Sequence, residues 1–284
     1  HKPNQWRLLI NGHTDVIGST TKRLGLRNVS SDLQDGKSVI AVDDGGYYLW
    51  GSSNNAGGTA AQIKFNDSLT APVGGTWTDI TETGNAPADC YVQFLSYPEL
   101  QKVYMTGAKA TATDEDHFLS TQTASYAGSP AIAEPNFAPR SKFITRYGSR
   151  IVHGYCARNA RNTAGVNGWT GGQWFGETVE YKAERIIWTG PSSTLATRKI
   201  YEYEDQGVTG YTNYTDLDGP VTGQASNASL FVAWTKDSMW MGDLLTTWRK
   251  RYSVGCDAGR SVKNVDIFTF WINKQGIWAF SGGK

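Results

Sequence analysis

The last quarter of the chain contains two similar stretches, residues 230–242 (LFVAWTKDSMWMG) and residues 267–282 (IFTFWINKQGIWAFSG). Each has a run of β-branched and aromatic residues, a short polar turn, and a second apolar run that ends at a glycine. Two such runs joined by a short polar turn are typical of a β-hairpin. The equivalent residues Trp234 and Trp271 are 37 positions apart, a spacing that indicates a structural repeat.

Four upstream segments follow the same template, namely residues 6–18, 38–51, 91–107 and 142–154. The first two turn at Asn11-Gly12 and at residues 43–46 (DDGG), and glycine tolerates the positive φ of tight hairpin turns. We therefore expect positive φ at Gly12 and Gly46. A further strand-like run, residues 184–190, lies in the widest interval between the closing glycines.

Isolated hairpins are marginally stable in water, so these hairpins must join larger sheets. The recurrence predicts an all-β protein, a β-propeller of about five or six blades at about 40–50 residues per blade. We expect each blade to have four strands with the apolar hairpin at its centre, and Trp234, Trp240, Trp271 and Trp278 to be largely buried. A pair of β-sandwiches is the alternative.

No boundary is visible in the sequence, so we expect residues 1–284 to form a single propeller domain. Because the chain begins at His1 and stops just after a repeat, we also expect it to be part of a longer chain.

The composition excludes several classes of protein. The net charge is +1 and 19% of the residues are charged, so no global basic or acidic surface indicates the partner. No stretch approaches the ~20 apolar residues of a transmembrane helix. The three cysteines, Cys90, Cys156 and Cys256, are far apart, which argues against both a disulfide framework and a zinc site. We expect Cys256 to be a small core residue.

Motifs of known chemistry are missing from the sequence. There is neither a phosphate-binding glycine loop followed by Lys-Ser/Thr nor a Gly-x-Ser-x-Gly motif. The four histidines, His1, His13, His117 and His153, share no metal-ligand spacing. We therefore expect no catalytic, cofactor-binding or metal-binding residue, no cofactor, and no enzyme activity.

Three polar segments have two interpretations each. Residues 114–117 (DEDH) suit a hard cation, but a solvated loop is the simpler interpretation. Residues 215–220 (TDLDGP) lack the regular ligands of a calcium loop, which favours a turn ahead of a strand. Residues 248–252 (WRKRY) alternate cations with aromatics as nucleic-acid surfaces do, but an outer strand with exposed cations is favoured.

The C-terminal half resembles the propeller-type virion proteins of tailed bacteriophages. The resemblance rests on residues 218–223 (DGPVTG), 229–240 (SLFVAWTKDSMW), 252–262 (YSVGCDAGRSV) and 275–283 (QGIWAFSGG). Two earlier strands, residues 149–154 (SRIVHG) and 185–189 (RIIWT), are similar to hairpins of that family. The likeness is a pattern of strands and turns, strongest from residue 140 to residue 284.

The resemblance implies a structural component of a phage tail or head–tail connector, located in the virion. Such subunits form a homo-oligomeric ring around the DNA channel and contact other tail or connector proteins. DNA would pass through the channel without sequence-specific binding, and no membrane span is expected. Function would then come from surfaces and symmetry rather than from an active site. The alternative is a carbohydrate-binding or glycan-active propeller, for which a pair of carboxylates would be expected.

Overall fold

The computed structural model describes residues 12–13, 21–22, 36–43, 47–66, 77–81, 87–109, 117–126, 139–157, 181–189, 214–227, 230–244 and 246–281. This part of the chain is all-β, with two short 3-10 turns, η1 (Pro98–Leu100) and η4 (Gly259–Ser261). None of the helices in the described ranges has the length and apolar character needed to cross a membrane.

Five antiparallel sheets follow one another along the chain, and each is built from strands that are consecutive in sequence. The first sheet contains β3 (Ser38–Asp43), β4 (Tyr47–Asn54), β5 (Ala61–Asn66) and β6 (Thr78–Asp79). The second contains β7 (Tyr91–Tyr97), β8 (Lys102–Ala108) and β9 (Phe118–Ser125). The third contains β10 (Arg140–Tyr147), β11 (Arg150–Ala157), β12 (Tyr181–Trp188) and β13 (Tyr214–Asp216).

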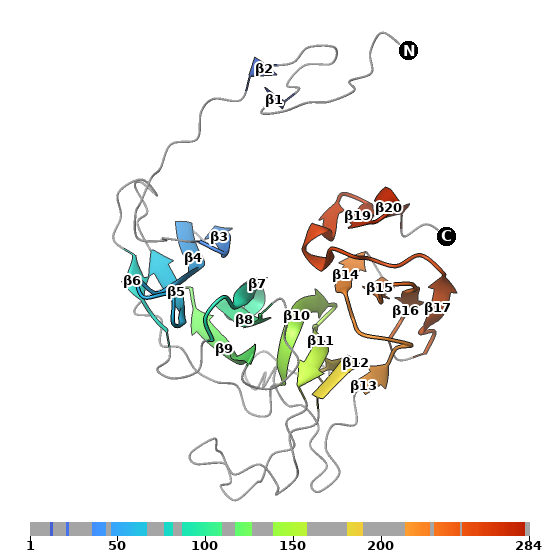
Figure 1. The fold of residues 1–284 in the computed structure, drawn as a ribbon, viewed down its shortest axis with the longest axis horizontal. Coiled ribbons are helices and arrows are strands. Elements are labelled where there is room, and N and C mark those ends of the chain that lie inside the picture. Colours follow the sequence, from blue (N-terminus) through green and yellow to red (C-terminus); the bar gives the residue numbers. More distant parts are fainter. Residues whose placement is uncertain are drawn as a thin grey trace, which may run out of the picture.

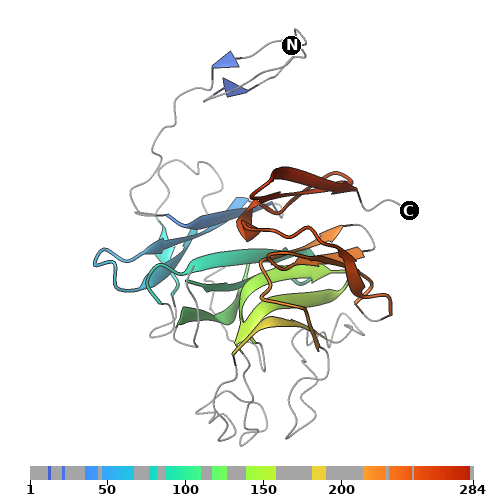
Figure 2. The same cartoon turned by 45° about the vertical axis from the view of Figure 1, so that its right-hand side comes forward.

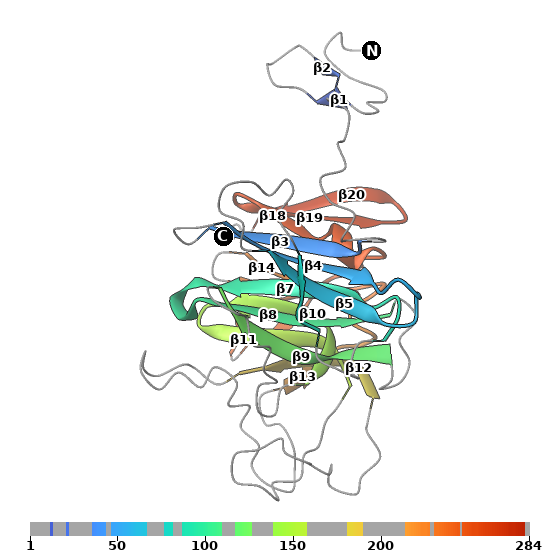
Figure 3. The same ribbon diagram turned by 90° about the vertical axis from the view of Figure 1, so that its left-hand side faces the viewer.

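The fourth sheet contains β14 (Gly223–Asn227), β15 (Leu230–Trp234), β16 (Met239–Gly242) and β17 (Arg249–Tyr252). The fifth contains β18 (Lys263–Val265), β19 (Phe268–Asn273) and β20 (Gly276–Ser281). A separate pair, β1 (Gly12–His13) with β2 (Thr21–Lys22), lies away from the five sheets in all three views (Figures 1, 2 and 3).

The five sheets are arranged along an arc, in sequence order from the first sheet to the fifth (Figure 1). Views turned by 45° and 90° show neighbouring sheets as successive twisted layers (Figures 2 and 3). The first strands of neighbouring sheets contact each other, β3 with β7, β7 with β10, β10 with β14, and β14 with β18. This propeller-like succession differs from the two facing sheets of a β-sandwich.

A hydrophobic core lies between each pair of neighbouring sheets. Between the first and second sheets, fully buried Trp50 packs against Phe65 with ring centroids 5.0 Å apart. Ile151 and Ile187 belong to the core between the second and third sheets, and Phe231 to the core between the third and fourth. The core between the fourth and fifth sheets contains Trp234 and Trp271. Each middle sheet therefore has a core on both of its faces, so successive residues of its strands are apolar on either side. This explains the near-continuous apolar runs in the sequence.

Five predicted hairpins are present, but their position within the sheets differs from the prediction. Residues 38–51, 91–107 and 142–154 form the first two strands of their sheets, whereas only residues 230–242 form a central pair. The last hairpin supplies the final two strands of a three-stranded sheet. In the first three sheets the apolar hairpin forms strands one and two, and in the fourth and fifth sheets it forms strands two and three. One extra strand, β14, therefore lies between Gly154 and Gly242 and lengthens that interval.

Trp234 and Trp271 are buried, as expected, and Trp240 and Trp278 are partly buried and pack against the cores. The indole N–H groups of Trp240 and Trp278 donate to Ser238 and Asn273. One expectation about a glycine is wrong. Gly12 lies in a strand and pairs with Lys22, where a turn was expected. Gly46 and most of residues 6–18 lie outside the described residues.

Candidate ligand-binding cavity at the centre of the sheets

The first strands of all five sheets surround one cavity of about 400 Å³. Its walls come from β3, β7, β10, β14 and β18, together with residues 259–262 just before β18. Because the first strands of all five sheets border it, this cavity lies at the centre of the arc. Ligand sites commonly lie in such central hollows.

A second cavity of about 490 Å³ opens beside the first, between the second, third, fourth and fifth sheets. The two cavities share four lining residues, Tyr91, Gln93, Gly259 and Arg260. We refer to these two adjoining cavities together as the central cavity. Its volume is typical of sites that bind small molecules.

Cationic and aromatic side chains alternate around the larger part of the central cavity. The Arg260 guanidinium carbon lies 3.1 Å from the centroid of the Tyr91 ring. The Lys142 ammonium nitrogen lies 4.8 Å from the centroid of the Tyr155 ring. Burial lowers the pKa of the Lys142 ammonium, and the neighbouring Arg260 charge lowers it further. Two like charges therefore face one partly desolvated space.

Negative charge is sparse among the described residues that line the cavity. Asp257 is the one acidic residue there, and its carboxylate accepts a hydrogen bond of 2.7 Å from the Lys274 backbone N–H. That bond fixes Asp257 to the turn between β19 and β20. Lys37 also borders the cavity, but its ammonium pairs with Asp89 at 3.4 Å. The cavity is therefore predominantly positive.

Close backbone packing holds Arg260 in place. Gly259 lies against the Thr222 carbonyl oxygen so closely that a Cβ at this position would overlap it. On the other side of Arg260, the Ser261 hydroxyl donates a hydrogen bond to the Ala258 carbonyl oxygen and accepts one of 2.9 Å from the Ile272 backbone N–H. The short turn η4 is thus bonded on both sides, and it presents Arg260 to the cavity on a rigid support.

Gln93 contributes a polar group from the second sheet. Its side-chain oxygen accepts a hydrogen bond of 3.0 Å from the Ile144 N–H of the third sheet. Within the described part of the chain, the amide NH₂ of Gln93 donates to no other residue. This side chain borders both parts of the cavity and retains donors for a ligand.

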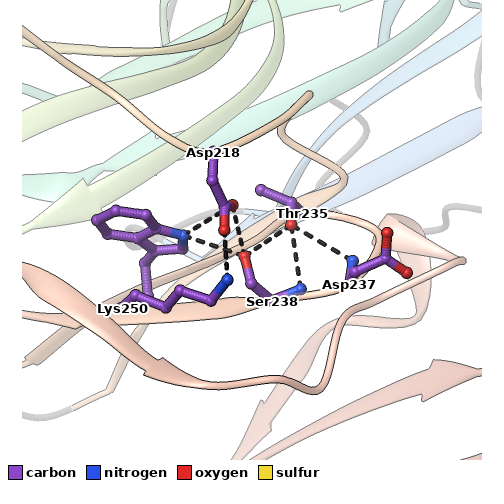
Figure 4. A network of polar contacts seen from close by, with 6 residues as sticks. Asp218, Thr235, Asp237, Ser238 and Lys250 are labelled. Atoms are coloured by element: carbon purple, nitrogen blue, oxygen red, sulfur yellow. Dashed lines mark hydrogen bonds and ion pairs between the residues drawn. The ribbon is translucent and has the colours of Figure 1, made fainter.

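The second polar network, around Asp218, is structural. Asp218 accepts hydrogen bonds from Ser238 and Trp240 through one oxygen and from Lys250 at 2.6 Å through the other (Figure 4). Partial burial raises the pKa of Asp218, but these three donors outweigh it and lower the pKa to about 2. Asp218 thus fastens the turn before β14 to β16 and β17, and the turn itself was predicted.

A serine–histidine pair that the sequence analysis missed lies in the third sheet. Ser141 Oγ and His153 Nδ1 are 2.7 Å apart on neighbouring strands of one hairpin. Both residues are fully buried, and desolvation lowers the pKa of His153 to about 3. Ser141 also meets Thr106 of the second sheet. The pair joins two sheets and has no access to a substrate from solvent.

The remaining sequence candidates occupy structural positions. Residues 249–252 form β17, the outer strand of the fourth sheet, and all four are exposed, as predicted. Cys90, Cys156 and Cys256 are buried free thiols, and burial raises the pKa of Cys256 to about 11. Residues 114–116 lie outside the described residues. Across the described ranges, no three His, Cys, Asp or Glu side chains are close enough to hold a metal ion.

The cavity residues carried no signal that sequence analysis can detect. Tyr91, Lys142 and Arg260 lie on or beside the first strands of three different sheets, far apart in the chain. No local motif joins them. Only the succession of sheets around one axis brings them together.

Comparison with solved structures gives distant likenesses. The AfRom2 CNH domain superposes with a TM-score of 0.44 at 10% identity, over 95% of this chain and 69% of that chain. Apo AztD from Citrobacter koseri gives 0.38 at 9% identity, over 85% and 67% of the two chains. An acylaminoacyl peptidase from Pyrococcus horikoshii gives 0.31 at 13% identity, over 84% of this chain and 41% of that one. No family model and no curated protein matches the sequence.

Proposed function

We propose that this chain is a structural component of a bacteriophage tail or head–tail connector, and that copies of it assemble into a ring. In this proposal the five sheets are blades of one propeller, within the five or six expected from the sequence. The observation that carries the assembly is an exposed apolar face at the end of the series of sheets.

The exposed face belongs to the fifth sheet. Side chains alternate between the two faces of a strand, and in β19 one set, Thr269 and Trp271, is buried against the fourth sheet. The other set includes Phe268 and Ile272, which are 40% and 42% exposed. Ile277, cross-strand from Ile272, is 77% exposed. Both faces of this sheet are therefore apolar, as expected of a sheet that is covered on both sides.

A second apolar face lies at the other end of the series, on the first sheet. Val42 and Trp50 point into the core shared with the second sheet, so their neighbours in sequence point outward. Of these neighbours, Ala41 is exposed and Leu49 is half-buried. Val39, two residues before Ala41 and so on the same side of β3, is 63% exposed and also borders the central cavity. The first and fifth sheets lie at opposite ends of the arc (Figure 1).

A second copy of the chain is the occupant that we propose for the face of the fifth sheet. The first sheet of one copy would pack on the fifth sheet of the next, a head-to-tail contact that closes into a ring if the rotation closes. With a net charge of +1, neighbouring copies do not repel one another strongly. The near-neutral chain also suits a subunit beside a DNA channel, because many phosphate contacts would retard the passage of DNA.

Analytical ultracentrifugation of the chain and of Ile277→Lys tests the assembly. The wild-type chain should sediment as an oligomer, and the lysine, placed in a desolvated contact, should shift it to the monomer without changing the circular dichroism spectrum. Lys236→Glu, on an exposed turn, is the control for a charge change elsewhere. A wild-type chain that stays monomeric at concentrations where virion proteins assemble would contradict the ring.

A carbohydrate-binding propeller is the second candidate function, and the central cavity is the observation that favours it. The cavity is large enough for a small sugar and is bordered by Tyr91 and Tyr155. Its single acidic residue among the described lining, Asp257, does not provide the pair of carboxylates that glycoside hydrolysis uses. The geometry therefore supports binding rather than cleavage.

A further inference from the structure

We propose that the central cavity binds a small organic anion, whose carboxylate or phosphate group is held by Lys142 and Arg260. The proposal concerns a ligand site within one chain, so it is independent of the ring and of the virion. A structural propeller needs no such site, because side chains alone can fill its axis.

Charge is the first argument. Arg260 forms no ion pair with any described residue, and its interaction is with the face of Tyr91. Lys142 is half-buried in the same cavity, and the pKa of its ammonium is lowered by burial and then by Arg260. Each positive charge thus raises the energy of the other, and a bound anion would lower the energy of both.

Geometry is the second argument. Arg260 is exposed to the cavity and is carried by a turn that is fixed through Gly259 and Ser261. The Arg260 guanidinium carbon lies 3.1 Å from the centroid of the Tyr91 ring, and this contact restricts the side chain, so little of its freedom would be lost when an anion binds. An arginine held in this way offers several N–H donors in a fixed fork to a carboxylate or a phosphate.

The lining also limits the kind of anion. The larger part of the cavity measures about 490 Å³, which admits a single small molecule and excludes a folded partner. Phe143 and Tyr155 provide apolar surface for the body of the ligand, and the amide NH₂ of Gln93 provides a donor for a hydroxyl or a carbonyl. These features describe a sugar acid or a sugar phosphate better than an inorganic ion.

Isothermal titration calorimetry with four probes tests the proposal. D-Glucuronate represents the carboxylate, glucose 6-phosphate the phosphate on a sugar, inorganic phosphate the bare anion, and glucose the neutral body. We expect glucuronate or glucose 6-phosphate to bind with a Kd below about 1 mM, and glucose not to bind at that concentration. The better of the two sugar anions identifies the anionic group that the cavity prefers. Binding of inorganic phosphate and of no other probe would show that the site takes an ion without an organic body, and it would overturn the proposal.

Variants locate the binding. Arg260→Gln and Lys142→Gln should each weaken binding of the sugar anion by about tenfold or more. Arg249→Gln, the same substitution on exposed strand β17, should leave the Kd unchanged. Arg260→Lys keeps the charge and should retain part of the affinity, which guards against an effect of misfolding. Equal affinity in Arg260→Gln and Arg249→Gln, or no binding of any probe to the wild-type chain at about 10 mM, would overturn the proposal.

Discussion

The indole rings of Trp234 and Trp271 pack against each other between the fourth and fifth sheets, with centroids 5.1 Å apart and planes tilted by 43°. The two residues occupy equivalent positions in the two repeated stretches, 37 residues apart. A repeat in the sequence thus becomes a contact between neighbouring sheets. Trp234 is fully buried and Trp271 is 3% exposed, so this pair forms the centre of the core between the two sheets.

Replacement of Trp271 by alanine should therefore destabilise the protein strongly. Loss of a buried indole and of its contact with Trp234 should lower the free energy of unfolding by about 3–5 kcal/mol. Chemical denaturation followed by circular dichroism measures the change. Ile277→Ala removes an apolar side chain that is 77% exposed in the single chain, and it should have little effect on the monomer. Equal midpoints for the two variants would contradict the proposed core.

Two glycines separate the cost of backbone conformation from the cost of steric overlap. Gly148 has φ of 57° and nothing lies where its Cβ would be, so Gly148→Ala should cost about 1 kcal/mol through the backbone alone. A Cβ at Gly255 would overlap the Lys236 backbone, so Gly255→Ala should cost more. Gly57→Ala, at ordinary φ with ordinary contacts, is the control. Thermal unfolding should show the largest destabilisation for Gly255→Ala, a smaller one for Gly148→Ala, and the smallest for Gly57→Ala.

Stability should decrease when the pH falls below about 6.5, and His153 is one identified cause. Desolvation lowers the pKa of His153 from 6.5 to about 3 in the folded chain, so the unfolded chain binds more protons between these values. This group therefore contributes full stability above pH 6.5 and loses roughly 1.4 kcal/mol per pH unit below it. His153→Asn should flatten the pH dependence of the unfolding free energy between pH 6 and pH 4, whereas Val152→Ala should lower stability equally at each pH. An unchanged slope in His153→Asn would contradict the buried neutral histidine.

Asp218 should contribute stability that is lost only in stronger acid. Its pKa in the folded chain is about 2, below the ordinary 3.8, so the contribution is complete above pH 3.8 and disappears as the pH falls toward 2. Asp218→Asn should lower the unfolding free energy at pH 7 by about 1 kcal/mol, because Asp218 is exposed and solvent screens its pair with Lys250. Asp237→Asn, at the neighbouring turn, is the matched control. If both variants unfolded at the same urea concentration, the network in Figure 4 would contribute nothing measurable to stability, contrary to this prediction.

The sequence predicted the strands well because their signal is local. Residues 230–242 and 267–282 carry apolar runs, a polar turn and a closing glycine, and they form β15–β16 and β19–β20. The position of each hairpin within its sheet was not predictable, since β14 (GQASN) and β18 (KNV) are short and polar. Their strand conformation comes from pairing with β15 and β19, which is a tertiary effect.

The cavity could not be predicted from the sequence for a related reason. Arg260 follows a glycine in a stretch that reads as an ordinary turn, and Lys142 precedes an apolar run that reads as an ordinary strand. Their common environment depends on five sheets turning around one axis. The Ser141–His153 pair was not predictable from the hairpin register either, because Ser141 pairs with Cys156 and His153 with Ile144, three positions away. The backbone departs from a regular strand between them, at Tyr155, which has φ of 59°.

Quantitative mass spectrometry of purified phage particles tests the proposed function most directly. The particles should come from a lysate in which this chain is expressed, and they should be separated from free protein by density-gradient centrifugation. The proposal predicts that the chain co-purifies with the particles in a fixed ratio to the known tail proteins, at the copy number of a ring. Absence of the chain from the particles, with all of it recovered as a free monomer at the top of the gradient, would contradict the proposal.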